Sequence, residues 1–111
     1  MKNNIVNISI ISHNDSHVVK NILEELCNFN FFNKILLTIN IKENIDELKN
    51  FKNLPIEFII NKKPKGFGEN HNYAHALSNC DYFIVINPDV KLQQLDFEVL
   101  ISYFNSKKAD L

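Results

Sequence analysis

A short apolar segment followed by Asn-Pro-Asp constrains the fold more strongly than any other part of the sequence. Residues 82–87 are almost wholly apolar and rich in β-branched and aromatic side chains, which is typical of a strand buried on both faces. Pro88 has no N–H to donate to a neighbouring strand, so it is expected to end this one. The sequence therefore predicts that Asp89 lies at the carboxyl end of a central strand, where open α/β sheets bind their ligands.

The rest of the chain alternates between strand-like and helix-like segments. The strands are expected at residues 5–11, 35–41, 56–61 and 82–87, and the helices at residues 16–27, 44–51, 69–79 and 95–106. This alternation predicts an α/β fold with a parallel sheet and right-handed crossovers. The commonest doubly wound, Rossmann-like arrangement gives the strand order 3-2-1-4. In the third helix, Tyr73, Ala74 and Leu77 are expected to face the core.

The composition indicates a folded domain that does not bind nucleic acid. The whole chain, residues 1–111, has the length of a single domain, and 45% of its residues are hydrophobic. Its net charge of -1 argues against a nucleic-acid surface, which needs clustered positive charge. All basic residues are lysines. A bound phosphate would therefore be held by lysine, backbone amides or a metal ion, and not by the bidentate guanidinium of arginine.

The cysteines and the start of the sequence indicate a cytoplasmic protein. Cys27 and Cys80 each fall near the end of an expected helix, and we expect buried free thiols in a reducing compartment. No segment approaches the ~20 apolar residues of a membrane span. The sequence after Met1 also lacks the apolar region of a signal peptide.

Two strand ends are expected to form a ligand-binding crevice. With the order 3-2-1-4, strand addition reverses direction between the first and fourth strands, and open α/β sheets bind ligands at such points. The first strand is followed by His13 and Asn14, and the fourth leads into Asn87 and Asp89. Asp89 is either an ordinary turn residue or a hard oxygen ligand for Mg²⁺ or Mn²⁺, with substrate phosphates and water completing the coordination.

A second candidate for ligand contact is the loop of Lys65, Gly66, Phe67 and Gly68, which contains both glycines of the protein. Glycine lets the backbone approach a ligand closely, and the helix that follows presents free amides at its N-terminus. The alternative is a flexible turn between a strand and a helix.

The helix after this loop carries polar side chains whose roles the sequence does not decide. Asn70 and Asn72 could bond a base or a ribose, or could merely cap the helix. His71 and His75 stand four residues apart on one helical face, but no third ligand is evident, and a zinc site is not expected. The sequence contains no convincing Ser-His-Asp or Cys-His constellation.

Three segments together resemble family 2 glycosyltransferases, in particular the rhamnosyltransferase-like bacterial enzymes that build surface polysaccharides. They are Ser12-His13-Asn14, the sequence Lys-Gly-Phe-Gly-Glu-Asn-His-Asn at residues 65–72, and Phe-Ile-Val-Ile-Asn-Pro-Asp-Val at residues 83–90. The resemblance covers nearly the whole chain. It implies a GT-A fold whose first half binds a nucleotide-diphospho-sugar.

The resemblance assigns a metal site to the end of the fourth strand. In the family, a strand-end Asp-x-Asp holds the ribose and the metal-bound diphosphate, and Asn87-Pro88-Asp89 stands in its place here. Asp89 thereby takes the role of the ligand to Mg²⁺ or Mn²⁺. Asn87 takes that of a ribose or diphosphate contact.

The resemblance also implies nucleotide contacts elsewhere. Ser12, His13 and Asn14 match the nucleotide-contacting end of the first strand. Asn40 falls where many relatives carry an aspartate that reads the base, and its amide could bond a pyrimidine edge. His71 stands where many relatives have an arginine.

The chain departs from the family in length. Family members continue into an acceptor-binding half that supplies an aspartate or glutamate as general base. Here only Asp96, Glu98 and Asp110 follow Asp89, and none matches the base motif. We therefore expect a truncated GT-A fold that binds the sugar donor. Its catalytic residues are unassigned, and a glycan acceptor would bind only if a second half completes the protein.

Two other functions are alternatives to this one. The same scaffold could be a non-catalytic module that binds a nucleotide or a partner. An unrelated flavodoxin-like receiver is disfavoured because receivers cluster acids after the first strand, where this chain has His13, Asn14 and Asp15. In the glycosyltransferase interpretation, peripheral association with the inner face of the membrane is open, and a truncated sheet edge favours self-association.

Overall fold

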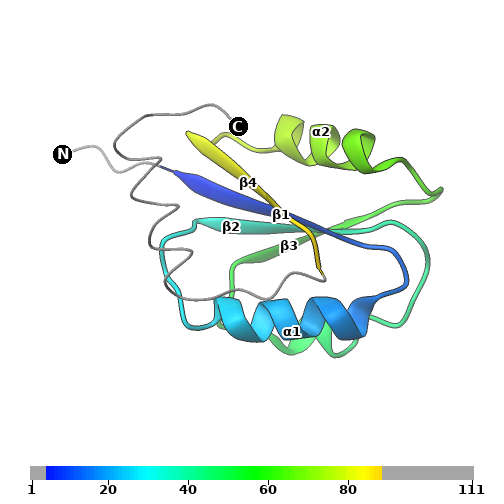
Figure 1. Cartoon of the computed structure of the whole chain (residues 1–111), viewed down its shortest axis with the longest axis horizontal. Coiled ribbons are helices and arrows are strands. Elements are labelled where there is room, and N and C mark those ends of the chain that lie inside the picture. The colour runs from blue at the N-terminus through cyan, green and yellow to red at the C-terminus, as the bar shows by residue number, and fades with distance from the viewer. Residues whose placement is uncertain (1–4, 89–111) are drawn as a thin grey trace.

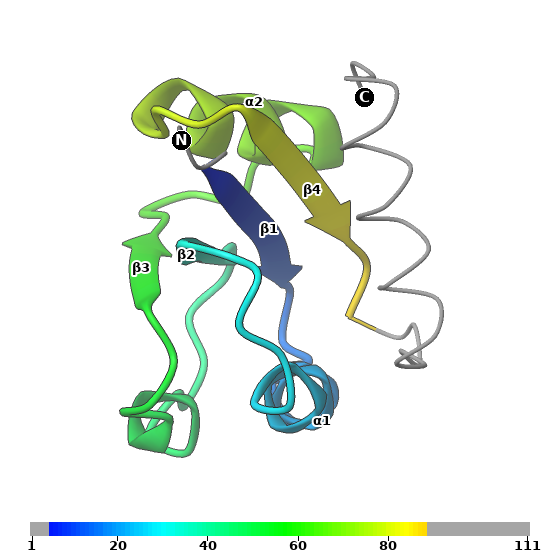
Figure 2. The same ribbon diagram turned by 90° about the vertical axis from the view of Figure 1, so that its left-hand side faces the viewer.

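Four parallel strands form the sheet of the computed structural model, which describes residues 5–88. The strands are β1 (Val6–Ser12), β2 (Lys34–Ile39), β3 (Ile56–Ile60) and β4 (Tyr82–Ile86). They lie in the order β3-β2-β1-β4, which can be followed in Figure 2. The predicted Rossmann-like α/β arrangement with the strand order 3-2-1-4 is therefore confirmed. The helix expected at residues 95–106 lies outside the described residues.

Two helices cover opposite faces of this sheet (Figure 1). α1 (Ser16–Leu26) connects β1 to β2, and α2 (Phe67–Leu77) connects β3 to β4. Because β4 lies beyond β1, on the side away from β2 and β3, the second connection crosses back over the sheet. With right-handed crossovers, this return places α2 on the face opposite α1. As a result β1 is covered on both faces.

The main apolar core lies between the sheet and α1. Alternate side chains of each strand point into this layer, because successive residues of a strand face opposite sides of a sheet. Its buried members from these elements are Val6, Ile8, Ile10, Val19, Ile22, Leu23, Leu26, Ile35, Leu37, Ile39, Ile84 and Ile86. Burial of each such side chain contributes roughly 1.5–3 kcal/mol. This layer therefore supplies most of the driving force for folding.

The layer beneath α2 is smaller and more polar. Its apolar members are Leu36, Ile59 and Ala74, with Phe83 packed against them. Its buried polar members include Asn7, Ser9, Thr38 and His71. Ala74 faces the sheet as predicted, but Tyr73 and Leu77 are 45% and 52% exposed, so their predicted inward orientation is wrong. The inward positions belong instead to Asn70 and His71, which find hydrogen-bond partners there.

The predicted helix at residues 44–51 is wrong. The segment contains only a short 3-10 turn, η1 (Leu48–Asn50). The Asn44 side chain accepts a hydrogen bond from the Asp46 N–H at 2.9 Å, and such a local bond competes with helix formation. Leu48 still belongs to the buried core. The apolar spacing thus marks core residues without requiring a full helix.

The prediction that β4 is a central strand buried on both faces is wrong for the described sheet. β4 lies at one edge, and Val85 is 43% exposed. α2 packs mainly on β1 and β2, so the described residues leave part of β4 uncovered. The strands with both faces buried are β1, where Ile8, Ser9 and Ile10 have no exposed surface, and β2, which is buried from residue 35 to its end.

Both cysteines are free thiols. Cys27 is exposed at the end of α1, so its predicted burial is wrong, whereas Cys80 is partly buried. Within residues 5–88 no helix combines the length and the apolar character needed to cross a membrane.

Replacing Leu37 by alanine tests the importance of the layer beneath α1. Leu37 has no exposed surface, and its truncation is expected to lower the free energy of unfolding by about 2–5 kcal/mol because it leaves a cavity. Urea unfolding measures the change. The matched control is Ile60→Ala at the end of β3, where the side chain is 60% exposed and a change of at most about 1 kcal/mol is expected. Equal losses in the two variants would contradict the assignment of the core.

Candidate functional site

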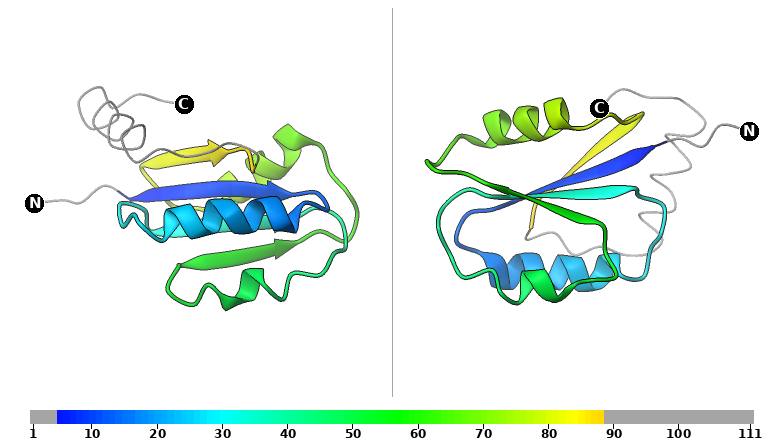
Figure 3. Two further views of the ribbon diagram at one scale, coloured as in Figure 1. Left: turned by 60° about the horizontal axis from the view of Figure 1, so that its bottom comes forward. Right: turned by 180° about the vertical axis from the view of Figure 1, so that it is seen from behind.

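The predicted ligand-binding residues occupy the carboxyl edge of the sheet. All four strands are parallel, so the segments that follow them emerge along the same edge (Figure 3). These segments carry Ser12, His13 and Asn14 at the end of β1, Asn40 after β2, Lys65 to Gly68 at the start of α2, and Asn87 after β4. Asp89 lies outside the described residues, so its metal-binding role stays a prediction.

The side-chain amide of Asn40 is the centre of a hydrogen-bond network at this edge. Asn40 is 4% exposed. Its Oδ1 accepts the backbone N–H of Lys65 at 2.8 Å, and its Nδ2 donates to the backbone carbonyl of Lys65 at 3.0 Å. The amide therefore pairs with both polar backbone groups of one residue. This pairing ties the segment between β3 and α2 to the end of β2.

Two further asparagines complete the network. Asn61, immediately after β3, donates from Nδ2 to the Oδ1 atoms of Asn40 at 2.8 Å and of Asn70 at 2.7 Å. Asn70 in α2 donates in turn to the Lys65 carbonyl at 3.2 Å. Buried amides are destabilising when unpaired, so the network favours one arrangement of the segments it joins. Sequence reasoning missed Asn61, although its position directly after a strand matches that of Asn40.

His13 joins this network from the end of β1. Asn40 Nδ2 lies 2.9 Å from His13 Nδ1, and the imidazole is exposed. The network thus connects four predicted contacts, namely His13, Asn40, Lys65 and Asn70. All four hydrogen-bonding positions of the Asn40 amide are used within the protein, which leaves none for a nucleobase.

Glu43 binds the loop between β1 and α1. Its Oε2 accepts the Ser12 hydroxyl at 2.7 Å and the Asn14 N–H at 3.0 Å. Its Oε1 accepts the Ser16 N–H at 3.0 Å. Asn14 has a φ of 60°, in the left-handed region that asparagine tolerates. Sequence reasoning missed Glu43, because no local pattern links it to this loop. The predicted contact Ser12 is therefore engaged within the protein, while the side chain of Asn14 is exposed.

The loop that begins α2 is open to solvent. A Cβ added to Gly66 or Gly68 would meet no atom within 4 Å, and neither glycine has a positive φ. The fold itself therefore does not require glycine at these positions, and both leave space around the backbone. Phe67 is 59% exposed, and Asn72 is exposed as well. The ammonium group of Lys65 lies 4.5 Å from the centre of the Tyr73 ring, a cation–π contact.

His71 is a buried histidine in the layer beneath α2. Its Nδ1 lies 2.8 Å from the Ser9 hydroxyl oxygen, and its ring contacts that of Phe67 at 4.4 Å between centroids. Burial lowers the pKa of the His71 imidazole, which favours the neutral ring. Its Nε2 is buried and has no hydrogen-bond partner among residues 5–88. His75 instead contacts the Phe83 ring. In the described part of the chain, no group of three His, Cys, Asp or Glu residues could hold a metal ion.

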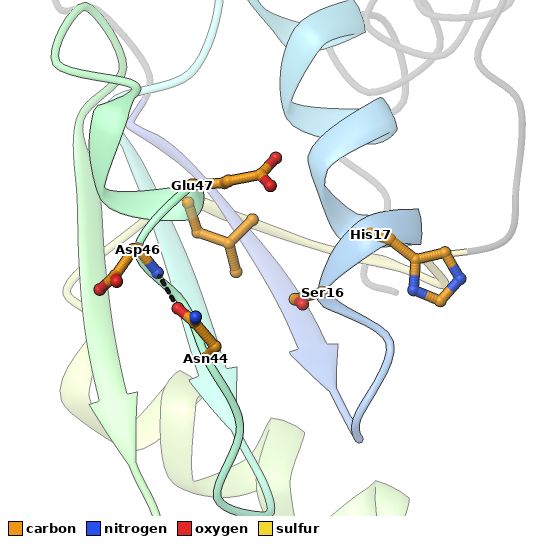
Figure 4. Close-up of a pocket in the computed structure, with 6 residues that line it drawn as sticks. Ser16, His17, Asn44, Asp46 and Glu47 are labelled. Carbon is orange, nitrogen blue, oxygen red and sulfur yellow. Dashed lines mark hydrogen bonds between the residues drawn. The ribbon is translucent and has the colours of Figure 1, made fainter.

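A cavity of about 240 Å³ lies beside the first turn of α1 (Figure 4). It is lined by Ser16, His17, Asn44, Asp46, Glu47 and Leu48. The carboxylates of Asp46 and Glu47 disfavour a phosphate there through like-charge repulsion. None of the predicted ligand contacts lines this cavity.

Comparison with known proteins identifies no family for the chain. No protein-family model and no curated protein matches the sequence. The resemblance to family 2 glycosyltransferases therefore stays an expectation from three sequence segments.

Replacing Asn61 by alanine tests the amide network. The change removes two donated hydrogen bonds and is expected to lower the free energy of unfolding by about 1–3 kcal/mol. Amide hydrogen exchange should become faster at Lys65, whose N–H donates to Asn40. Asn79→Ala, at an exposed position outside the network, should leave exchange at Lys65 unchanged. Full protection of Lys65 in the Asn61 variant would show that the network does not hold this segment.

The stability of the protein should depend on pH through His71. Its pKa is lowered in the folded state, so the unfolded chain binds a proton more readily once the pH falls below about 6.5. The free energy of unfolding should therefore be constant with respect to this group above that pH and decline below it. Urea unfolding across this range measures the slope. His71→Gln should reduce the slope, whereas Asn79→Ala, which removes no titratable group from an exposed position, should not. An unchanged slope in His71→Gln would rule out this linkage.

Proposed function

We propose that this chain is a glycosyltransferase-type domain that binds a nucleotide-diphospho-sugar through Mg²⁺ or Mn²⁺. The observation that carries the proposal is the pairing of β1 with β4. The two strands are parallel neighbours, with Ile10 opposite Ile86, and the strand order reverses between them. Ligands of open α/β sheets bind beyond the carboxyl ends at such a point. There the sequence supplies His13 and Asn14 on one side and Asn87 on the other.

The proposed metal ligand is Asp89, three residues after the end of β4. A single carboxylate suits Mg²⁺ or Mn²⁺, because these ions take one or two carboxylates and complete their coordination with phosphate oxygens and water. The amide oxygen of Asn87 is a second hard donor of the same kind. When bound, the metal would neutralise charge on the diphosphate.

The diphosphate would also bind near the N-terminus of α2. The first N–H groups of a helix have no partner within the helix and favour anions. The open space around Gly66 and Gly68 supports such an approach. Lys65, which directly precedes Gly66 and whose ammonium lies over the Tyr73 ring, is the nearest lysine in the sequence. Since the chain contains no arginine, lysine and backbone amides are the expected phosphate contacts.

A cytoplasmic location fits this function. The two thiols are both free, which fits a reducing compartment, and there the protein would encounter nucleotide sugars. Transfer of the sugar to a glycan acceptor at the inner face of the membrane would also need an acceptor site and a general base.

Thermal unfolding with metal and nucleotide tests the proposal. A panel of nucleoside diphosphates with Mn²⁺ should include one that raises the melting temperature. At 100 times the dissociation constant, the ligand adds ~2.7 kcal/mol of stability, equivalent to roughly 10 °C for a domain of this size. Asp89→Ala should abolish the shift in the presence of metal.

The matched control is Asp46→Ala, which removes an exposed carboxylate from the cavity beside α1. This variant should retain the full shift. Absence of a shift with every nucleoside diphosphate would refute the proposed function. An equal shift in Asp89→Ala would refute the role of Asp89 as metal ligand.

A further inference from the structure

The orientation of the Asn40 amide is fixed by its two bonds to Lys65. The backbone N–H of Lys65 can only donate, and its carbonyl can only accept. The atom of Asn40 that faces the N–H at 2.8 Å must therefore be Oδ1, and the atom that faces the carbonyl at 3.0 Å must be Nδ2. Donation from Asn61 Nδ2 to the same Oδ1 at 2.8 Å agrees with this orientation.

This orientation determines the role of His13 Nδ1. Asn40 Nδ2 carries two protons, of which one is donated to the Lys65 carbonyl. The other faces His13 Nδ1 at 2.9 Å, so Nδ1 must accept a hydrogen bond. In a neutral imidazole only one ring nitrogen carries a proton, and that nitrogen is then Nε2. The opposite tautomer would set two N–H donors against each other.

We propose that Asn40 is a positioning residue that holds His13 in its Nε2–H tautomer. His13 thereby presents a neutral hydrogen-bond donor to an acceptor oxygen of the bound nucleoside diphosphate. The inference about the ligand rests on the proposed function, whereas the tautomer follows from hydrogen bonds within the protein. Asn40 then acts through His13, because its own amide is 4% exposed and fully bonded.

The surroundings of His13 support this role. Asn61 from the end of β3 bonds the Asn40 amide directly. Asn70 from α2 bonds both Asn61 and the Lys65 carbonyl, so it holds two of the partners of Asn40 in place. The backbone N–H of His13 is itself bonded to Asp15 Oδ1 at 2.7 Å. The imidazole ring is exposed, and within residues 5–88 its Nε2 makes no hydrogen bond. A donor held in this way loses little conformational freedom when a ligand binds.

The first experiment measures the tautomer without any ligand. Long-range ¹H–¹⁵N NMR of the protein at about pH 8.5, where histidines are neutral, distinguishes a protonated from an unprotonated ring nitrogen. His13 should show an unprotonated Nδ1 and a protonated Nε2. Asn40→Asp should move the proton to Nδ1, because a carboxylate can only accept. A protonated Nδ1 in the unmodified protein would overturn the assignment, whatever the stability of the variant.

The second experiment separates the two ring positions of His13 by substitution. His13→Asn keeps an oxygen that can accept from Asn40 near the position of Nδ1 but removes the outer donor. His13→Gln supplies an N–H near the position of Nε2. Titration calorimetry with the nucleoside diphosphate and Mg²⁺ should show a dissociation constant about tenfold higher or more for His13→Asn. His13→Gln should stay within about threefold of the unmodified protein, as should the control His17→Asn on the exposed surface of α1.

These results distinguish failure of the inference from failure of the proposed function. If the nucleotide binds and His13→Asn binds as tightly as His13→Gln, the donor role of His13 is overturned while the proposed function stands. If no nucleoside diphosphate binds the unmodified protein, the proposed function and the ligand role of His13 both fail. In that case the NMR experiment still decides whether Asn40 fixes the tautomer.

Discussion

The pairing of the Asn40 side chain with the backbone of Lys65 holds the carboxyl edge together. Parallel strands leave this edge as a row of separate loops, because each connection must cross the sheet before the next strand begins. Here one buried amide satisfies both polar backbone groups of Lys65 and binds Asn61 and His13 as well. The ends of β1 and β2 and the start of α2 are thereby joined. The positions of His13 and Lys65 depend on that amide, whereas Ser12 and Asn14 are held by Glu43.

The two faces of the sheet differ in the kind of side chains that they bury. The layer beneath α1 is an apolar core, whereas the layer beneath α2 buries Asn7, Ser9, Thr38 and His71. Some polar atoms in the second layer, including Asn7 Oδ1 and Thr38 Oγ1, have no hydrogen-bond partner among the described residues. Such burial is destabilising. The apolar layer therefore has to offset a polar one, which makes the protein sensitive to changes such as protonation of His71.

Alternating strands and helices were sufficient to predict the parallel sheet and its order, because crossover handedness leaves few arrangements. Local patterns were insufficient where a side chain bonds across the chain. The local bond from the Asp46 N–H to Asn44 disfavours the helix expected at residues 44–51. In α2, His71 faces β1, where it pairs with Ser9, and Tyr73 is left facing solvent. Most of the candidate site was predicted as a set of residues. The hydrogen bonds between these residues were not predicted, since no sequence spacing links Asn61 to Asn40 or Glu43 to Ser12.

We propose that the edge formed by the segments after β1 and β4 and before α2 binds a nucleoside diphosphate with a divalent metal. The most direct test is an NMR titration of the ¹⁵N-labelled protein with a nucleoside diphosphate and Mg²⁺, following every backbone amide. If the nucleotide binds at this edge, saturable shifts are expected at His13, Gly66, Gly68 and Asn87. Shifts confined to the cavity lined by His17 and Asp46, or no saturable shift at all, would show that the nucleotide does not bind there.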